Sequence, residues 1–153
     1  ENLWAVCWNI EHSRSRTRRV REDHPDEMNI YRAIVRSRFL EVGGFDPTAG
    51  YEDDATLYPR LGVMARYAPG AICYHNNPGT LREIMESARW IGRSIKFTRP
   101  RKVIRFTLPF SFLYAVVQSI RYRIPRFFVF KLIHDVGILA GWLSRLLLKE
   151  YTK

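Results

Sequence analysis

The chain has 153 residues and a formal net charge of +10 at pH 7, with 25 lysines and arginines against 15 acids. This length allows one modest core. The positive charge indicates an anionic partner, and nucleic acid, an anionic membrane surface and a phosphate-bearing substrate all satisfy it. Cys7 and Cys73 lie in apolar runs without CxxC spacing. This excludes a disulfide-dense secreted scaffold and predicts buried free thiols in a reducing compartment.

The first apolar run, Leu3 to Trp8, predicts a buried strand whose sheet neighbours lie elsewhere in the protein. An arginine-rich loop follows, from Ser13 to Arg21. Two interpretations of this loop stay open, a solvated charge run and a contact with phosphates or lipid headgroups. A nucleic-acid arm is the least favoured, because no aromatic residue is interleaved with the arginines to stack on bases.

The next predicted strand runs from Met28 to Val35. A short helix from Ser37 to Val42 follows, ends at Gly43 and leads into a glycine-containing bend. In the bend, Gly43 to Pro47, the two glycines admit left-handed backbone, the phenylalanine anchors the turn, and Asp-Pro prevents a helix from continuing. We therefore expect a rigid turn.

Three consecutive acids, Glu52, Asp53 and Asp54, follow the bend. A rigid support of this kind presents carboxylates at the rim of a cleft. Both motifs also have ordinary interpretations, since a glycine pair ends many helices and acids at a helix N-terminus complement its dipole.

A helix is predicted to begin near Tyr58 or Pro59, with Leu61, Met64 and Ala65 at helical spacing. A short strand, residues 71–74, then ends at His75. The next predicted helix opens with a capping box, in which a threonine precedes a glutamate by three residues, Thr80 and Glu83. Its apolar face is formed by Leu81, Ile84, Met85, Ala88, Ile91 and Ile95.

The C-terminal third is basic and apolar. It contains no acid between Arg89 and Lys131. The uncharged run Phe106 to Ile120 is shorter than the roughly 20 residues of a spanning helix. The next apolar segment, Phe127 to Leu148, is long enough but carries Lys131, His134, Asp135 and Arg145. We predict two helices in or dipping into a membrane interface. Core helices on a further part of the protein, or one true span, stay open.

The segment from Ala33 to Asp46, which contains Arg36-Ser37, Phe39 and Val42-Gly43-Gly44-Phe45-Asp46, resembles the second half of the catalytic domain of family 2 glycosyltransferases. The Glu52-Asp53 pair, His75 and Arg89-Trp90 also fall where this family has such residues, so that the resemblance covers residues 28–97. It implies an α/β fold, the acceptor-side half of a GT-A (Rossmann-like) domain over residues 1–98. A membrane-associating tail of amphipathic and hydrophobic helices, 99–153, would follow. The nucleotide-binding half would precede Glu1, so we expect the chain to be truncated.

The resemblance implies transfer of a sugar from a nucleotide-sugar donor to a hydroxyl or phosphate of a lipid-linked, glycan or membrane-proximal acceptor, on the cytoplasmic face of a membrane. Asp53 would be the general base. His75 would help to hold a divalent metal, Mg or Mn, or contact the donor diphosphate, although a histidine at a strand end is more often a structural hydrogen-bonding residue. Arg89-Trp90 resembles the end of the Gln-x-x-Arg-Trp element of polymerising members, but Glu86 stands in place of the glutamine, so the resemblance does not extend to processivity. The implied substrate-binding residues are Gly44, Glu52, Asp54, Arg89 and Trp90.

Two other functions compete with this one. A non-catalytic, basic membrane-binding or interaction module would make the acidic turn purely structural. Nucleic-acid binding through the arginine-rich loop is unfavoured for the reason given above.

Overall fold

The computed structural model describes residues 2–13, 27–28, 31, 33–66, 76–94 and 100–148. Within these ranges the chain is mainly helical, and the strands are limited to β1 (Glu27–Met28) and β2 (Ala65–Arg66). These two strands pair antiparallel, with Glu27 opposite Arg66. The prediction of an α/β, Rossmann-like half-domain is therefore wrong for the described part of the chain. The predicted strand from residue 71 and the 98/99 domain boundary lie outside the described residues.

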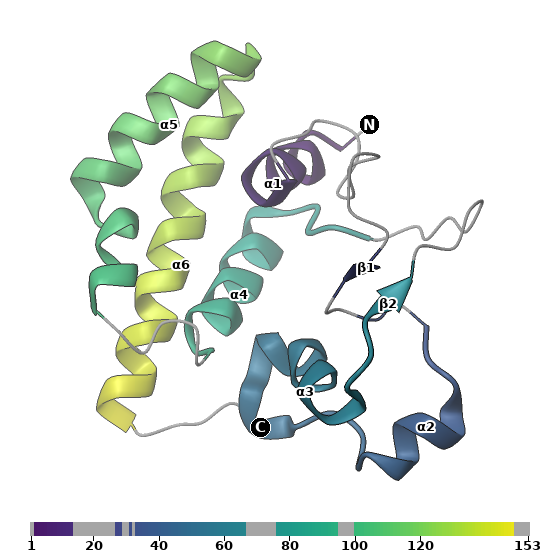
Figure 1. Cartoon of the computed structure of the whole chain (residues 1–153). Coiled ribbons are helices and arrows are strands. Elements are labelled where there is room, and N and C mark those ends of the chain that lie inside the picture. The colour runs from purple at the N-terminus through teal and green to yellow at the C-terminus, as the bar shows by residue number, and fades with distance from the viewer. Residues whose placement is uncertain are drawn as a thin grey trace.

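The first apolar run forms a helix, α1 (Leu3–Ser13), and not the predicted strand. Asn2 supports its start, since its Oδ1 accepts from the Trp4 N–H at 2.9 Å and its Nδ2 donates to the Gly79 carbonyl at 3.0 Å. A short run of continuous apolar residues does not distinguish a buried strand from a helix that is buried on most sides. Here the run is helical and packs against α6 (Figure 1).

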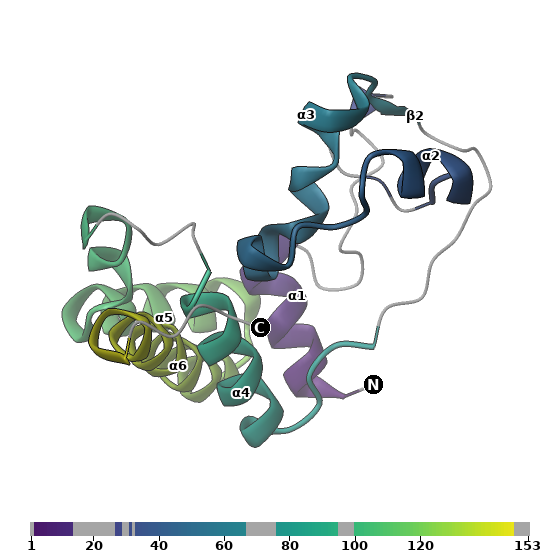
Figure 2. The ribbon, with the colours of Figure 1, turned by 90° about the horizontal axis from the view of Figure 1, so that it is seen from below.

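One lobe is built around α6 (Arg126–Leu148), which packs against three helices, α1, α4 (Leu81–Gly92) and α5 (Leu108–Tyr122). Figures 1 and 2 show α5 and α6 as a hairpin, with α4 along the other side of α6. Two short 3₁₀ turns, η3 (Pro100–Lys102) and η4 (Ile104–Phe106), precede α5. Fully buried side chains, including Phe127, Phe130 and Ile138 of α6, form the core of this lobe.

The predicted capping box is confirmed at the start of α4. The Thr80 hydroxyl accepts from the Glu83 N–H at 3.2 Å, and Glu83 Oε2 accepts from the Thr80 N–H at 3.2 Å and the Gly79 N–H at 2.7 Å. These bonds satisfy donors that every helix N-terminus leaves without an intrahelical partner. The predicted helices in the C-terminal third are also confirmed as α5 and α6.

Helices α4 and α6 approach each other through glycine. A Cβ placed on Gly92 would lie 2.2 Å from the Ile138 carbonyl oxygen, and one on Gly141 would lie 2.0 Å from the Arg89 carbonyl oxygen. Gly137 is opposite Ala88, whose Cβ would be 2.7 Å from the added atom. Small residues at four-residue spacing on both helices thus let the two backbones touch.

A second, smaller lobe contains β1, β2, α2 (Arg36–Glu41), the 3₁₀ helix η1 (Pro47–Thr56) and α3 (Tyr58–Leu61). The predicted short helix that ends near Gly43 is confirmed as α2. The helix predicted from Tyr58 begins there but does not reach Ala65, because Gly62 takes a left-handed conformation (φ 67°) and ends it. Ala65 belongs to β2 instead.

Candidate functional site

The glycine-containing bend has the left-handed glycines that its sequence predicts. Gly43 and Gly44 have φ of 80° and 74°, a left-handed conformation that glycine adopts without steric cost. The Gly44 N–H donates to the Phe39 carbonyl at 2.9 Å. The Phe45 ring meets the Phe39 ring edge to face, with centroids 5.0 Å apart. A Cβ on Gly44 would approach the Phe39 ring to 3.3 Å, so the turn and the rings fit closely.

The start of η1 is capped by Asp46. Its Oδ1 accepts from the Thr48 N–H at 2.9 Å and from the Thr48 hydroxyl at 2.6 Å. These two hydrogen bonds stabilise the carboxylate and hold the pKa of Asp46 below its usual range. Because its carboxylate is hydrogen-bonded within the turn, Asp46 is not a candidate for the general base.

Arg60 joins the two ends of the bend, a role that no sequence pattern predicts. Its guanidinium donates to the Val42 carbonyl, the Thr56 carbonyl and the Thr56 hydroxyl, each at 2.9 Å. The Thr56 hydroxyl in turn donates to the Asp53 backbone carbonyl at 2.5 Å. The backbone that carries Asp53 is therefore fixed by a guanidinium that does not bind the Asp53 carboxylate.

Asp53 and Asp54 lie in η1 with half-buried side chains. Within the described part of the chain, the Asp53 carboxylate has no ion-pair partner. Glu52 lies in the same 3₁₀ helix, and His75 lies outside the described residues. The bend thus brings Gly44 and the acids onto one support.

The remaining predicted site residues, Arg89 and Trp90, lie on α4, which contacts η1. Arg89 donates to the Ser144 hydroxyl of α6 at 3.4 Å, and the Trp90 side chain is 47% exposed. In the sequence, Arg145 is a charge within an apolar segment. In the structure it donates to the Ser94 carbonyl, just after the C-terminal end of α4, at 2.8 Å. It therefore serves the α4–α6 contact.

A buried ionic cluster, which we define as Glu11, Lys131, His134 and Asp135, joins α1 to α6. Lys131 Nζ lies 2.7 Å from Glu11 Oε1 and 2.9 Å from Asp135 Oδ1. His134 Nδ1 lies 2.9 Å from the same Asp135 oxygen. Lys131, His134 and Asp135 are each at most 4% exposed. In the sequence, Lys131, His134 and Asp135 stand out as ionisable residues within an apolar segment, whereas Glu11 follows an apolar run that predicts a strand and carries no signal of its own.

Aromatic rings enclose the buried ionic cluster. The His134 ring stacks on Phe130 with centroids 5.6 Å apart and meets Trp8 edge to face at 5.8 Å. The ammonium of Lys131 lies 5.4 Å from the Phe106 ring centroid and 4.9 Å from that of Tyr114. Such rings keep water away and lower the local dielectric, which strengthens the ion pairs and raises the cost of any charge left unpaired.

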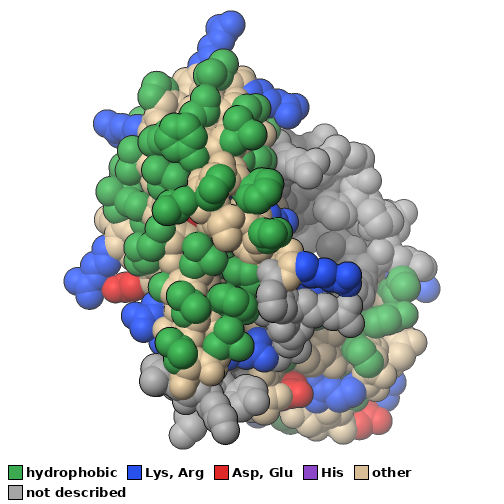
Figure 3. All heavy atoms as spheres, turned by 90° about the vertical axis from the view of Figure 1, so that its left-hand side faces the viewer, with side chains coloured by type: hydrophobic (Ala, Val, Ile, Leu, Met, Phe, Trp, Pro, Cys, Tyr) green, Lys and Arg blue, Asp and Glu red, His purple; other side chains and the backbone are tan. Residues whose placement is uncertain are grey.

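The outer face of the α5–α6 hairpin is apolar. Figure 3 shows hydrophobic side chains over most of this face, with lysines and arginines at its margins. Helix α6 is long and apolar enough, over Arg126–Leu147, to cross a membrane. The exposed large hydrophobic residues of α5 are Leu108, Phe110, Phe112, Leu113, Tyr114, Val117 and Ile120.

Comparison of the chain with protein-family models, with curated proteins and with solved structures found no match.

Proposed function

We propose that this chain belongs to a membrane-associated glycosyltransferase, in which Asp53 removes the proton from an acceptor hydroxyl as that hydroxyl attacks the donor sugar. One observation carries the proposal. The backbone of Asp53 is fixed by Arg60 and Thr56, while its carboxylate is left without an ion-pair partner among the described residues. The resemblance to family 2 supports the same residue as the base.

The chemistry needs a carboxylate that is ionised and within about 3 Å of the acceptor hydroxyl. A guanidinium bound to the carboxylate would stabilise its charge and weaken it as a base. Arg60 instead uses its donors on the Val42 carbonyl and on Thr56. Arg60 therefore holds the backbone that carries Asp53 and leaves the Asp53 carboxylate to react.

The donor in this proposal is a nucleotide-sugar. The acceptor is a hydroxyl or phosphate carried by a lipid or glycan at the cytoplasmic face of the membrane. Gly44, Glu52, Asp54, Arg89 and Trp90 are the proposed substrate contacts, with Trp90 offering a half-exposed ring to a sugar. A divalent ion, Mg²⁺ or Mn²⁺, is implied by the resemblance alone. No step is assigned to it, because His75 lies outside the described residues.

Asp53→Asn tests the role of the base. We expect transfer from the nucleotide-sugar to fall by about 10²-fold or more, because the amide cannot accept the proton, while donor binding is unchanged. Transfer is measured with membranes containing the whole protein and a labelled donor, and donor binding by equilibrium dialysis. Glu41→Gln is the matched control, since Glu41 is an exposed acid of the same lobe that pairs with Arg38 at 2.8 Å. Near-normal transfer in Asp53→Asn would exclude this residue as the base.

The apolar face of α5 favours a second candidate, a basic module that binds membranes without catalysis. Exposed apolar residues gather on the α5–α6 hairpin, and arginines flank α5 at Arg105, Arg121 and Arg123. A helix of this kind lies in the plane of an interface, with its apolar side in the acyl region and its arginines on anionic headgroups. The two candidates share this surface and differ in whether Asp53 reacts.

Replacing three exposed residues of α5, Leu113, Val117 and Ile120, by glutamine tests the membrane contact. We expect vesicle binding to weaken by roughly 10²-fold, since each buried side chain contributes about 1 kcal/mol at a half-immersed position. Flotation with anionic vesicles measures this. The matched control replaces three equally exposed apolar residues of the smaller lobe, Val35, Leu40 and Val63, and should float like the unchanged protein. Equal flotation of both variants would contradict the assignment.

A further inference from the structure

Helix α5 has the reverse of the polarity expected for a helix on the surface of a water-soluble protein. The residues that it buries are small, namely Ser111 and Ala115. Its large apolar residues point outward instead, and Leu108, Leu113 and Ile120 are 64%, 64% and 72% exposed. A helix in water turns its apolar side toward the protein core. The outer side of α5 is therefore suited to an apolar environment.

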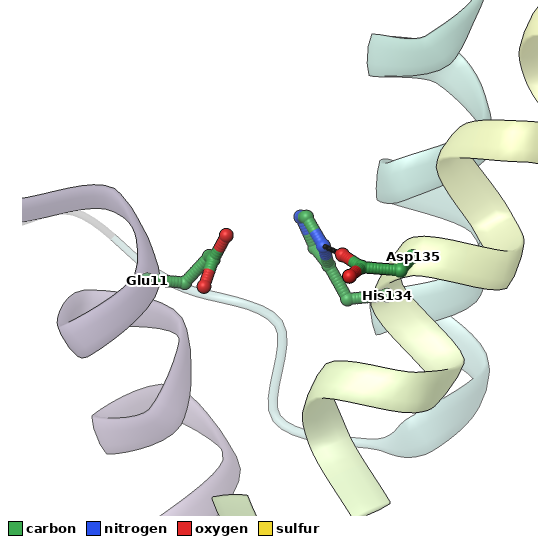
Figure 4. Close-up of side chains that lie close together, drawn as sticks. All are labelled: Glu11, His134 and Asp135. Atoms are coloured by element: carbon green, nitrogen blue, oxygen red, sulfur yellow. Dashed lines mark hydrogen bonds and ion pairs between the residues drawn. The ribbon is translucent and has the colours of Figure 1, made fainter. Parts of the chain in front are cut away.

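Helix α6 keeps its charges inside the protein. Lys131, His134 and Asp135 belong to the buried ionic cluster, and Figure 4 shows the last two on the side of α6 that faces Glu11 of α1. Between the arginines near the two ends of α6, the exposed residues are Val129, Val136 and Leu143. Both helices of the α5–α6 hairpin therefore expose apolar side chains along most of their length.

Every exposed charge in residues 100–148 is positive. The single acid of this segment is Asp135, which is buried. Arg105 precedes α5, and Arg121 and Arg123 lie at its C-terminal end. Arginines at both ends of an apolar helix can extend their guanidinium groups to phosphates while the helix lies among acyl chains. This arrangement matches an anionic leaflet.

A second copy of the chain is the other partner that an apolar face could bind. Two-fold pairing through α5 would bring the same surface of both copies together, with its arginines. The whole chain carries a net charge of +10, so the two copies repel each other. The same charges attract an anionic lipid. The charge of the hairpin therefore favours lipid over a second copy.

The position of α4 opposes an arrangement in which α6 crosses the membrane. Helix α6 is long and apolar enough to cross, but α4 packs against its middle, where Gly137 and Gly141 meet the backbone of Met85 and Arg89. Arg89 and the neighbouring Glu86 are exposed on α4. If α6 crossed, these charges would lie at the depth of the hydrocarbon, where charged side chains are costly.

We propose that α5 is inserted lengthwise into the acyl region of one leaflet of an anionic membrane, and that both ends of α6 stay on the same side of the bilayer. This inference deepens the membrane association of the proposed function and rests on it. The arginines at the two ends of α5 then bind phosphates of that one leaflet. Helix α4 lies along the other side of α6 from α5, so its charges remain in water (Figures 1 and 2).

A membrane-impermeant maleimide tests on which side the ends of α6 lie. The background variant of the whole protein is Cys73→Ala. Cys7 stays, because it is buried and burial raises the pKa of its thiol from 9.0 to about 11, which keeps it unreactive. Pro125→Cys and Leu147→Cys then each place one exposed thiol, at opposite ends of α6.

The protein is added to sealed vesicles of phosphatidylcholine and phosphatidylglycerol. We expect both thiols to be labelled from outside to the same extent before and after detergent opens the vesicles. Protection of one thiol until detergent is added would show that α6 crosses the bilayer, and would overturn the proposal. The background variant should remain unlabelled throughout.

Fluorescence quenching tests the depth of α5 in the same vesicles. A fluorophore is attached at Val117→Cys, on the outer side of α5, and at the matched control Val63→Cys in the smaller lobe, where the side chains are 50% and 58% exposed. Bromine on the acyl chains should quench the label at position 117 at least about twofold more than a quencher on the headgroups. The label at position 63 should be unquenched by either. Stronger quenching from the headgroups at position 117 would overturn the insertion.

The outcomes separate this inference from membrane association itself. If the unchanged protein does not float with the vesicles, the membrane association of the proposed function falls, and the inference falls with it. If the protein floats but the label at position 117 is unquenched, and Val117→Cys forms a disulfide between two copies under oxidation, the outer side of α5 binds a second copy. That result would overturn the inference alone.

Discussion

Gly141→Ala is expected to lower the free energy of unfolding by about 2–3 kcal/mol. The added Cβ would lie 2.0 Å from the Arg89 carbonyl oxygen and 2.9 Å from its carbon, so α4 and α6 must separate. No rotamer change relieves this contact, because both atoms belong to the backbone of the facing helix. Alanine favours a helix over glycine by about 1 kcal/mol, and the clash must exceed this gain. Urea unfolding followed by circular dichroism measures the difference.

Two variants serve as comparisons for the stability of Gly141→Ala. Val136→Ile also adds one carbon to α6, but at a side chain that is 43% exposed, and should change stability by less than about 0.5 kcal/mol. Gly137→Ala should be milder than Gly141→Ala, because its contacts at 2.7 and 3.0 Å include the Ala88 side chain. If Gly141→Ala were as stable as the unchanged protein, the close crossing of α4 and α6 would be wrong.

Lys131→Met is expected to cost about 3–5 kcal/mol, the largest effect of any single side chain in the buried ionic cluster. The substitution leaves Glu11 and Asp135 buried without the ammonium that lies 2.7 and 2.9 Å from them. Methionine occupies a similar volume, so the loss comes from charge and not from a cavity. Urea unfolding at neutral pH gives the free energy.

The matched control for Lys131→Met is Arg82→Met. It breaks an ion pair of similar length, 2.8 Å to Glu86, whose side chains are 88% and 61% exposed. Solvent screens this pair, so stability should be unchanged within error. Adding Glu11→Gln to Lys131→Met should recover part of the loss, because one uncompensated charge disappears, and the recovery measures the coupling. Equal losses in Lys131→Met and Arg82→Met would show that burial does not matter at this pair.

Local signals in the sequence predicted the elements that depend on neighbouring residues. The capping box of Thr80 and Glu83 predicted where α4 begins, and Gly43 predicted where α2 ends. The apolar runs of the last third gave α5 and α6. In each case the interactions that decide the structure lie within a few residues of one another.

Elements that depend on distant partners could not be predicted in the same way. The run that begins at Leu3 is apolar without a clear period, and its helical form depends on burial beside α6. The pair of Glu11 with Lys131 spans 120 residues, so no local pattern reports it. Two local patterns of α6 are nevertheless present in the sequence. Lys131 and Asp135 have the spacing of a helical ion pair, and Gly137 and Gly141 have the four-residue spacing of a close helix crossing.

Because α1 packs against α6, its contacts form late during synthesis. Helix α1 leaves the ribosome before α6, which is made about 120 residues later. At about 5–20 residues per second, the Trp8 side chain waits roughly 6–24 s for the α6 residues that bury it. During that interval the apolar side chains of α1 are exposed on the nascent chain, so a chaperone or a lipid surface has its best opportunity to bind α1 before α6 is made.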